Sequence, residues 1–168
     1  LPALLTYSKK LSKAKHQTIR AELTAAEYGH HFAIQHVSSV TIDEIGILQA
    51  TFLAMQQAVV SLAGQLGNSG IQIAHILVDG NLCPVFDWPA SPIIKGDSKS
   101  LSIAAASIMA KTERDGLMQS LGREYPHYGW HKNAGYGTAE HQDAMRQSGI
   151  TPYHRKSFLP VKRMIQSA

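Results

Sequence analysis

Runs of apolar residues predict three strands along the chain. Residues 71–78 are largely apolar and β-branched, which favours a buried strand, and this run ends at Asp79 before a Pro-punctuated loop. Residues 30–40 alternate loosely between apolar and polar and predict a half-exposed strand, and a short strand is expected around Ile93 and Ile94. Asp79 is thus expected where a strand leaves the sheet, a common place for ligands in α/β proteins, although Asp-Gly-Asn is also an ordinary turn.

Helical spacing of apolar residues predicts three amphipathic helices, each beginning at a hydroxyl side chain that can cap the first turn. The first is capped by Ser12 and closes near Gly29. The second begins at Thr41 and carries a broad apolar stripe to Gly64 or Gly67, which core packing explains. The third covers residues 138–149 and ends at a glycine.

A fourth helix is predicted within residues 95–115, KGDSKSLSIAAASIMAKTERD, where a Lys-Gly-Asp turn and a serine-rich cap precede a run of small residues. Ala104, Ile108, Lys111 and Asp115 fall along one side at helical spacing, which places the Asp115 carboxylate at the edge of a core. An acid near the C-terminal end of a helix is unfavourable for the helix dipole. A solvated ion pair with Lys111 explains Asp115 equally well from this stretch alone.

The order of these elements predicts an α/β or mixed α+β fold. With 168 residues, 44% of them apolar, the chain is long enough for one domain with an adequate core, residues 1–168, with a helical C-terminal part from about residue 122. Residues 122–137 are rich in aromatic residues, Gly and His and read as a loop. No apolar run approaches a membrane span, and no signal-peptide pattern opens the chain.

Charge and cysteine content narrow the class of protein further. The net charge is +4, and a single cysteine, Cys83, excludes an intramolecular disulfide and suggests a reducing, cytoplasmic compartment. Basic side chains crowd both ends of the chain, which points to a polyanion as partner, although a solvated basic surface is a common alternative. These residues are Lys9, Lys10, Lys13, Lys15 and Arg20 at one end and Arg155, Lys156, Lys162 and Arg163 at the other.

Four stretches, in their order and spacing, resemble the ribonuclease HII family, the type 2 ribonucleases H: VDGN, KGDSKSLSIAAASIMAKTERD, YPHYGWHKNAGYGTAEH and TPYHRKSFLPVK. The stretches SKKLS and DEIGILQATFLAMQQAV resemble that family too, so the likeness covers essentially the whole chain. The resemblance implies an RNase H-like fold, with a mixed central sheet flanked by helices. It also implies four carboxylates that gather two divalent ions, Mn²⁺ or Mg²⁺.

Two of those carboxylates map onto Asp79 and Asp115, which are the candidate catalytic residues and metal ligands. The family's Gly-Tyr motif maps onto Gly135 and Tyr136, and the resemblance implies that the tyrosine ring stacks on the sugar at the ribonucleotide-to-deoxyribonucleotide junction. Ser8, Lys9 and Lys10 are candidates for phosphate contacts, although a charged first turn facing water explains them as well.

The implied activity is metal-dependent endonucleolytic cleavage of RNA in RNA–DNA hybrids and at ribonucleotides embedded in duplex DNA. Cleavage is expected on the 5′ side of the ribonucleotide, leaving a 3′-hydroxyl and a 5′-phosphate, by a cytoplasmic monomer in DNA repair. Paired hard cations can activate water and stabilise the leaving oxygen, and the 2′-hydroxyl distinguishes RNA from DNA.

The chain departs from the family at its start. The family begins with a strand that ends in Asp-Glu and a Gly-Arg-Gly turn, which supply two metal ligands and read the 2′-hydroxyl, and neither stands in this sequence, which begins at Leu1 rather than Met. Two central strands are thus expected to be missing, and the chain alone is expected to be inactive and poorly folded. The alternative is a catalytically incomplete nucleic-acid-binding fragment. Smaller departures are Tyr7, where Asp is usual, and Gly46, where Asn is usual.

A zinc site is not expected despite nine histidines. His127 and His131 are four apart, but Pro126 and Gly129 argue against a helix that would bring them together, and Cys83 has no nearby sulfur partner. A lone cysteine is more often inert packing than a nucleophile.

Overall fold

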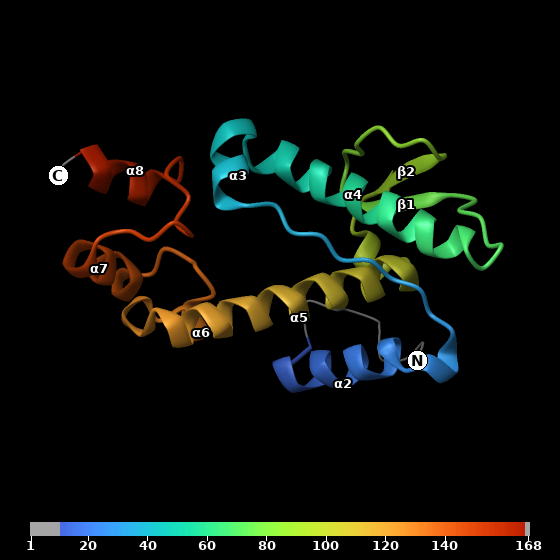
Figure 1. Ribbon diagram of the computed structural model, residues 1–168, viewed down its shortest axis with the longest axis horizontal. Coiled ribbons are helices and arrows are strands. Elements are labelled where there is room, and N and C mark those ends of the chain that lie inside the picture. The colour runs from blue at the N-terminus through green and yellow to red at the C-terminus, as the bar shows by residue number, and fades with distance from the viewer. Residues whose placement is uncertain (1–10, 167–168) are drawn as a thin grey trace. The chain divides into compact units, whose positions relative to one another are not determined.

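The computed structural model describes residues 11–166, which form two compact units. The first unit takes in the described residues up to His36 together with Phe52–Thr112. The second takes in Val37–Thr51 and the described residues from Glu113 onward. Figure 1 shows the order of the elements along the chain.

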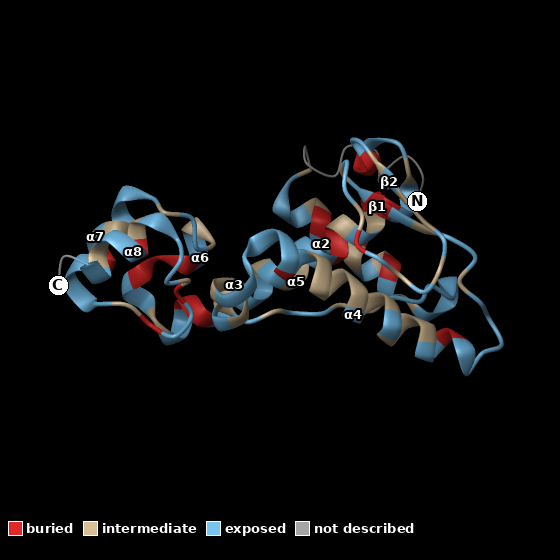
Figure 2. Cartoon of the chain, turned by 90° about the horizontal axis from the view of Figure 1, so that it is seen from above, coloured by how far each residue is buried: buried red, intermediate tan, exposed pale blue. Residues whose placement is uncertain are grey.

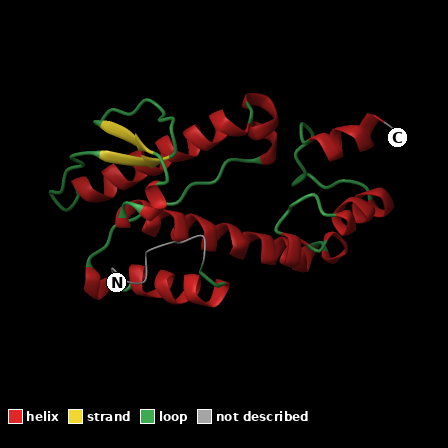
Figure 3. Cartoon of the chain, turned by 180° about the vertical axis from the view of Figure 1, so that it is seen from behind, coloured by secondary structure: helices red, strands yellow, loops and turns green. Residues whose placement is uncertain are grey.

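The sheet of the first unit is a pair of parallel strands, β1 (Ile76–Asp79) and β2 (Ala90–Ile93), drawn in yellow in Figure 3. The register sets Ile76 opposite Ala90 and Asp79 opposite Ile93. The α/β class is therefore confirmed, although the described residues are mostly helical and hold only this small sheet. The predicted strand over 71–78 begins later than expected because only its last residues meet a neighbouring strand.

The first helix of this unit confirms its prediction. Helix α2 (Lys13–Thr24) begins after Ser12, whose hydroxyl accepts a hydrogen bond from the Lys15 amide, and the short 3-10 helix η2 (Ala26–Tyr28) ends at Gly29. The polar N-cap satisfies an amide that the helix leaves unpaired. The buried core of this unit joins α2 to the start of the alanine-rich helix through Ile19, Leu23, Ala104, Ile108 and Met109.

The alanine-rich helix is longer than predicted. Helix α5 runs over Leu101–Glu124, preceded by the 3-10 helix η3 (Gly96–Ser98), so Asp115 lies inside the helix and not near its C-terminal end. The expectation of a carboxylate opposed to the helix dipole was therefore wrong. Leu121 explains the extension, because it is buried in the core of the second unit and holds the last turns in helical form.

The predicted helix from Thr41 is two helices, α3 (Ser39–Ile45) and α4 (Ile47–Gly67). Ser38, not Thr41, caps α3, and its hydroxyl accepts the Thr41 amide at 3.1 Å. Gly46 separates the two helices because its φ of 79° lies outside the helical region, where glycine is tolerated without steric cost.

The half-exposed strand predicted over residues 30–40 is wrong. Residues 30–38 have no regular structure, and the chain enters α3 at Ser39. A strand needs a neighbour for its backbone groups, and within residues 11–166 no strand pairs with this segment.

The apolar stripe of α4 is less buried than core packing alone would require. Of its residues only Ala50 and Leu66 are buried, and much of the helix is half-buried or exposed, as Figure 2 shows. Within the described residues α4 is the one helix with the length and apolar composition of a membrane span, a test that core helices of soluble proteins also pass.

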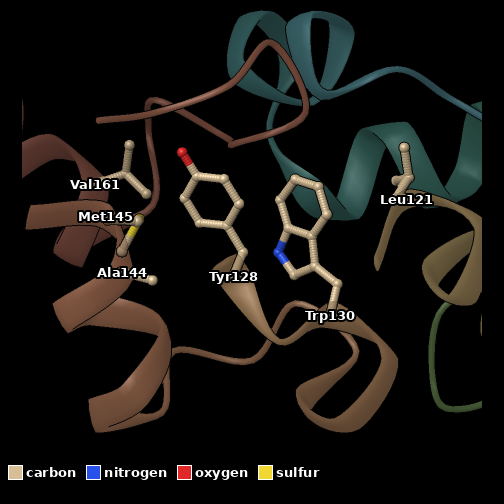
Figure 4. Packing of buried hydrophobic residues seen from close by; sticks show 6 residues of the cluster. All are labelled: Leu121, Tyr128, Trp130, Ala144, Met145 and Val161. Atoms are coloured by element: carbon tan, nitrogen blue, oxygen red, sulfur yellow. The ribbon is translucent and has the colours of Figure 1, made fainter. Parts of the chain in front are cut away.

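The core of the second unit is aromatic (Figure 4). Leu121 of α5, Tyr128, Trp130, Ala144, Met145 and Val161 form its buried cluster. These residues come from α5, from the 3-10 helix η4 (Pro126–Tyr128), and from α6 (Trp130–Asn133), α7 (Ala139–Ser148) and α8 (Leu159–Gln166).

The predicted loop over residues 122–137 thus contains two short helical segments, because its aromatic residues form a core. The predicted cap of the following helix is confirmed. The Thr138 hydroxyl accepts the His141 amide, and α7 ends at Gly149.

Candidate functional site

Asp79 occupies the end of β1, as the sequence predicts. Its carboxylate is exposed, and its Oδ1 accepts the backbone N–H of Gly96 at 2.7 Å. Gly80, directly after it, has a φ of 117° and turns the chain away from the strand. A carboxylate at this position has one oxygen fixed by a backbone amide while the side chain stays open to solvent.

Gly96 can hold the carboxylate because it has no side chain. A Cβ at this position would lie 2.5 Å from Ile103 Cδ1 and 3.3 Å from Asp79 Oδ1 and Ile93 Cβ, so any larger residue must displace a neighbour. Lys95 precedes it in the left-handed region with a φ of 55°. The Lys-Gly-Asp turn therefore builds the support for Asp79.

Asp97, the next residue of this turn, is only 6% exposed. Asp97 is not among the site residues predicted from the sequence, and the signal that could have found it is its place in the Lys-Gly-Asp turn directly before the alanine-rich helix. Buried carboxylates are retained where they are hydrogen-bonded or paired, so Asp97 belongs to the supporting turn of the site.

Asp115 lies half-buried within α5, in the second unit, whereas Asp79 lies in the first. The convergence of these two carboxylates on one ion therefore remains a prediction. Among residues 11–166, no group of three or more His, Cys, Asp or Glu side chains is placed to hold a metal ion.

Tyr136 projects from a loop of the second unit with 68% of its surface exposed. The Arg114 guanidinium stands over its ring at 5.6 Å, and the same guanidinium donates to the carbonyl of Ala134 at 2.7 Å. Gly135, with a φ of 80°, donates its amide to Asn133 Oδ1 at 2.9 Å. One face of this ring is covered by the Arg114 cation, and the backbone before it is held by hydrogen bonds. An exposed aromatic ring held in this way is suited to stacking against a planar group or a sugar.

The loop after Tyr136 is also fixed. Gln142 Nε2 donates to the carbonyl of Gly137 at 2.9 Å, and the Phe158 ring would come within 3.3 Å of a Cβ at Gly137. Sequence reasoning found Gly135 and Tyr136 but missed the braces Arg114 and Gln142. Gln142 lies in the helix that follows the motif, which is a local signal, whereas Arg114 stands 20 residues before Ala134, so no local pattern points to it.

The remaining candidates are three residues near the start of the chain and two histidines. Ser8, Lys9 and Lys10 fall outside the described residues, so their phosphate contacts stay a prediction. His127 and His131, considered as zinc ligands, stand in separate helical segments, η4 and α6.

The chain matches the family model of Ribonuclease HII over residues 4–161. The ribonuclease HII of Paramagnetospirillum magneticum is 49% identical over 154 residues, which cover 92% of this chain and 72% of that relative. The ribonuclease HII of Rhodospirillum rubrum is 47% identical over 167 residues, with 98% of this chain and 73% of that relative covered.

The fold matches as well. The crystal structure of the ribonuclease H2 from Pyrococcus horikoshii OT3 is similar at a TM-score of 0.66 and 20% identity, over 96% of this chain and 80% of that chain. The chain accordingly shares the fold of that structure. The chain belongs to the ribonuclease HII family, a family of endoribonucleases that are hydrolases, use divalent metal ions and act on RNA–DNA substrates.

Proposed function

We propose that this chain serves metal-dependent endonucleolytic cleavage of RNA in RNA–DNA hybrids and at single ribonucleotides in duplex DNA. Cleavage falls on the 5′ side of the ribonucleotide and leaves a 3′-hydroxyl and a 5′-phosphate. The observation that carries the proposal is the carboxylate of Asp79, exposed at the end of a strand and held by the Gly96 amide. Strand ends of this kind are where α/β folds place ligands.

Asp79 and Asp115 are the proposed metal ligands. Carboxylate oxygens suit hard cations such as Mn²⁺ and Mg²⁺, and the fixed, solvent-open carboxylate of Asp79 fits such an ion. When bound, a pair of divalent ions supplies an activated water and neutralises the leaving oxygen. The chain's own task is to keep the Asp79 carboxylate oriented, which the Gly96 N–H does by donating to its Oδ1.

Tyr136 and Gly135 are the proposed contacts to the sugar at the junction between ribonucleotide and deoxyribonucleotide. The ring has 68% of its surface exposed and is backed by Arg114, so it can stack on a sugar without rearranging. Ser8, Lys9 and Lys10 are proposed to hold backbone phosphates, which carry no sequence information. We place this activity in the cytoplasm, in a monomer that acts in DNA repair.

The second candidate is a nucleic-acid-binding chain with an incomplete metal site. It is favoured by one observation, that residues 11–166 hold no cluster of three potential metal ligands. Under this candidate the 168 residues alone bind a hybrid and do not cut it. Cleavage then needs a further Asp-Glu pair joined upstream.

A cleavage assay separates the two candidates. A labelled duplex with a single ribonucleotide is incubated with Mn²⁺ and either the 168-residue chain or the same chain preceded by an Asp-Glu/Gly-Arg-Gly segment. We expect cleavage 5′ to the ribonucleotide by the extended chain, its loss in Asp79→Asn, and unchanged duplex binding by that variant. Absence of Mn²⁺-dependent cleavage by the extended chain would refute the proposed activity, and cleavage by the 168 residues alone would refute the incomplete-site candidate.

A further inference from the structure

The Asp43 carboxylate of helix α3 accepts three hydrogen bonds from the basic C-terminal segment. Its Oδ2 accepts the amide of Lys156 at 2.7 Å, and its Oδ1 accepts both the amide and the hydroxyl of Ser157, at 2.9 and 2.5 Å. Ser39, on the same helix, donates its hydroxyl to the carbonyl of Pro152 at 2.7 Å. Both ends of the segment 152–157 are therefore tied to α3.

The electrostatics of Asp43 agree with this attachment. Partial burial raises the pKa of a carboxyl group, but the hydrogen bonds from Ser157 and Lys156 and the nearby charge of Arg155 outweigh it and leave the pKa of Asp43 below its usual value. The ionised form is thus the one that the segment 155–157 binds. Two backbone amides aimed at one carboxylate fix the backbone conformation of that segment.

The segment held in this way presents Arg155 next to the Tyr136 loop. The Arg155 guanidinium stacks over the Phe158 ring at 5.1 Å, and the Phe158 ring packs against Gly137, the residue after Tyr136. Lys156 is exposed, and Arg155 is half-buried by its stacking. A planar guanidinium held by an aromatic ring loses less side-chain freedom when it binds a phosphate than a free one does.

We infer that Asp43 is a positioning residue that shapes the segment Arg155–Ser157 into a phosphate-binding surface for the nucleic-acid strand whose sugar stacks on Tyr136. The inference rests on the proposed function, because it takes the same substrate and extends its contacts away from the junction. The contacts are to the backbone, so they carry no sequence preference. The class of ligand is a nucleic-acid phosphodiester.

Because Asp43 is negatively charged, the inference and its alternative predict opposite changes in polyanion binding when this charge is removed. If this acid merely lay near the basic segment, neutralising it would remove a repulsion and strengthen polyanion binding. If it positions the segment, the same neutralisation releases Lys156 and Ser157 and weakens binding. Glu44, the next residue of α3, is exposed and offers a matched control with the same change of charge.

The experiment measures binding of the 168-residue chain to a fluorescent RNA–DNA hybrid by anisotropy over a salt series, without Mn²⁺. The salt slope is the steepness with which the logarithm of the affinity falls against the logarithm of the salt concentration. For Arg155→Gln we expect about one phosphate contact fewer, which lowers this slope by about 0.9 and the affinity by roughly tenfold at 0.1 M salt. Asp43→Asn should also weaken binding and flatten the slope despite its added positive charge. Glu44→Gln should bind as tightly as the parent chain or more tightly, and Arg123→Gln, an exposed arginine of α5, should lower affinity less than Arg155→Gln.

A double variant tests whether Asp43 acts through Arg155. Asp43→Asn combined with Arg155→Gln should lose less than the product of the two single losses, because the second change removes a contact that the first has already disordered. Ser157→Ala, which deletes one hydrogen bond to Asp43, serves as a milder variant should Asp43→Asn fail to fold by circular dichroism. Equal or tighter binding by Asp43→Asn or, if it does not fold, by Ser157→Ala, with an unchanged salt slope, would overturn the inference and leave the proposed function standing. Failure of the parent chain to bind the hybrid would overturn the inference and the nucleic-acid-binding candidate, whereas the proposed cleavage is decided separately by the assay on the extended chain.

Discussion

His154 gives the most quantitative prediction about stability. It is 7% exposed, and its Nδ1 accepts the amide of Thr151 at 2.9 Å. Its Nε2, which carries the proton in this arrangement, is buried without a hydrogen-bond partner among the described residues. The ring stacks on His141 with centroids 5.2 Å apart. A second proton would place a charge in this aromatic core and a hydrogen against the Thr151 amide.

Burial, followed by repulsion from His141, lowers the pKa of His154 from 6.5 to about 4. The unfolded chain therefore binds a proton below about pH 6.5 that the folded chain does not take up until about pH 4, so this residue makes the protein less stable as pH falls through that window. Between pH 7 and pH 5 the two pKa values give a loss of about 2 kcal/mol. For a chain of this size that corresponds to a fall in melting temperature of roughly 4–8 °C.

The assay is thermal unfolding of the parent chain, His154→Gln and His127→Gln at pH 7 and pH 5. Glutamine cannot titrate, so His154→Gln should lose most of the pH-dependent difference, whatever its stability at pH 7. His127, which is solvent-exposed, serves as the matched control, and its replacement should leave the difference intact. The reasoning is refuted if His154→Gln is destabilised by acid as much as the parent chain is.

Three further predictions concern single residues. Gly96→Ala places a methyl group against Ile103 Cδ1 and should lower the free energy of unfolding, measured in urea, by about 1–3 kcal/mol. It should also weaken Mn²⁺ binding, because the methyl group displaces Asp79. Unchanged Mn²⁺ binding would contradict the role of Gly96. Tyr136→Ala should change the free energy of unfolding by less than about 0.5 kcal/mol but reduce binding of duplexes that contain a ribonucleotide. Tyr136→Phe should preserve both the stability and the binding. Equal binding by Tyr136→Ala and the parent chain would exclude the stacking role. Thr138→Ala removes the N-cap of α7 and should cost about 1 kcal/mol by the same denaturation assay, with no loss in Thr138→Ser.

The sequence predicted well where a local signal decides the structure. Ser12, Thr138 and Gly149 mark helix ends through hydrogen bonds or turns made within a few residues, and each was found at its predicted place. Asp79 was found at the end of a strand because an apolar run stops there.

The sequence failed where distant parts of the chain decide. The segment over 30–40 alternates like a strand but has no neighbour to pair with, and Leu121 extends α5 because a core formed by later residues buries it. Asp43 passed unnoticed because its partners, Lys156 and Ser157, lie more than a hundred residues away. A sequence pattern reports on residues that are close along the chain, whereas the contacts of Leu121 and Asp43 join residues that only the fold brings together.

Manganese binding is the most direct test of the central proposal, that Asp79 and Asp115 coordinate the same divalent ion. Calorimetric Mn²⁺ titrations of the chain, Asp79→Asn, Asp115→Asn and the double variant form a cycle in which a shared ion produces coupling between the two positions. We predict that each single variant loses affinity and that the double variant loses clearly less than the sum of the two free-energy changes. Strictly additive losses, or Mn²⁺ binding that neither replacement affects, would contradict the claim.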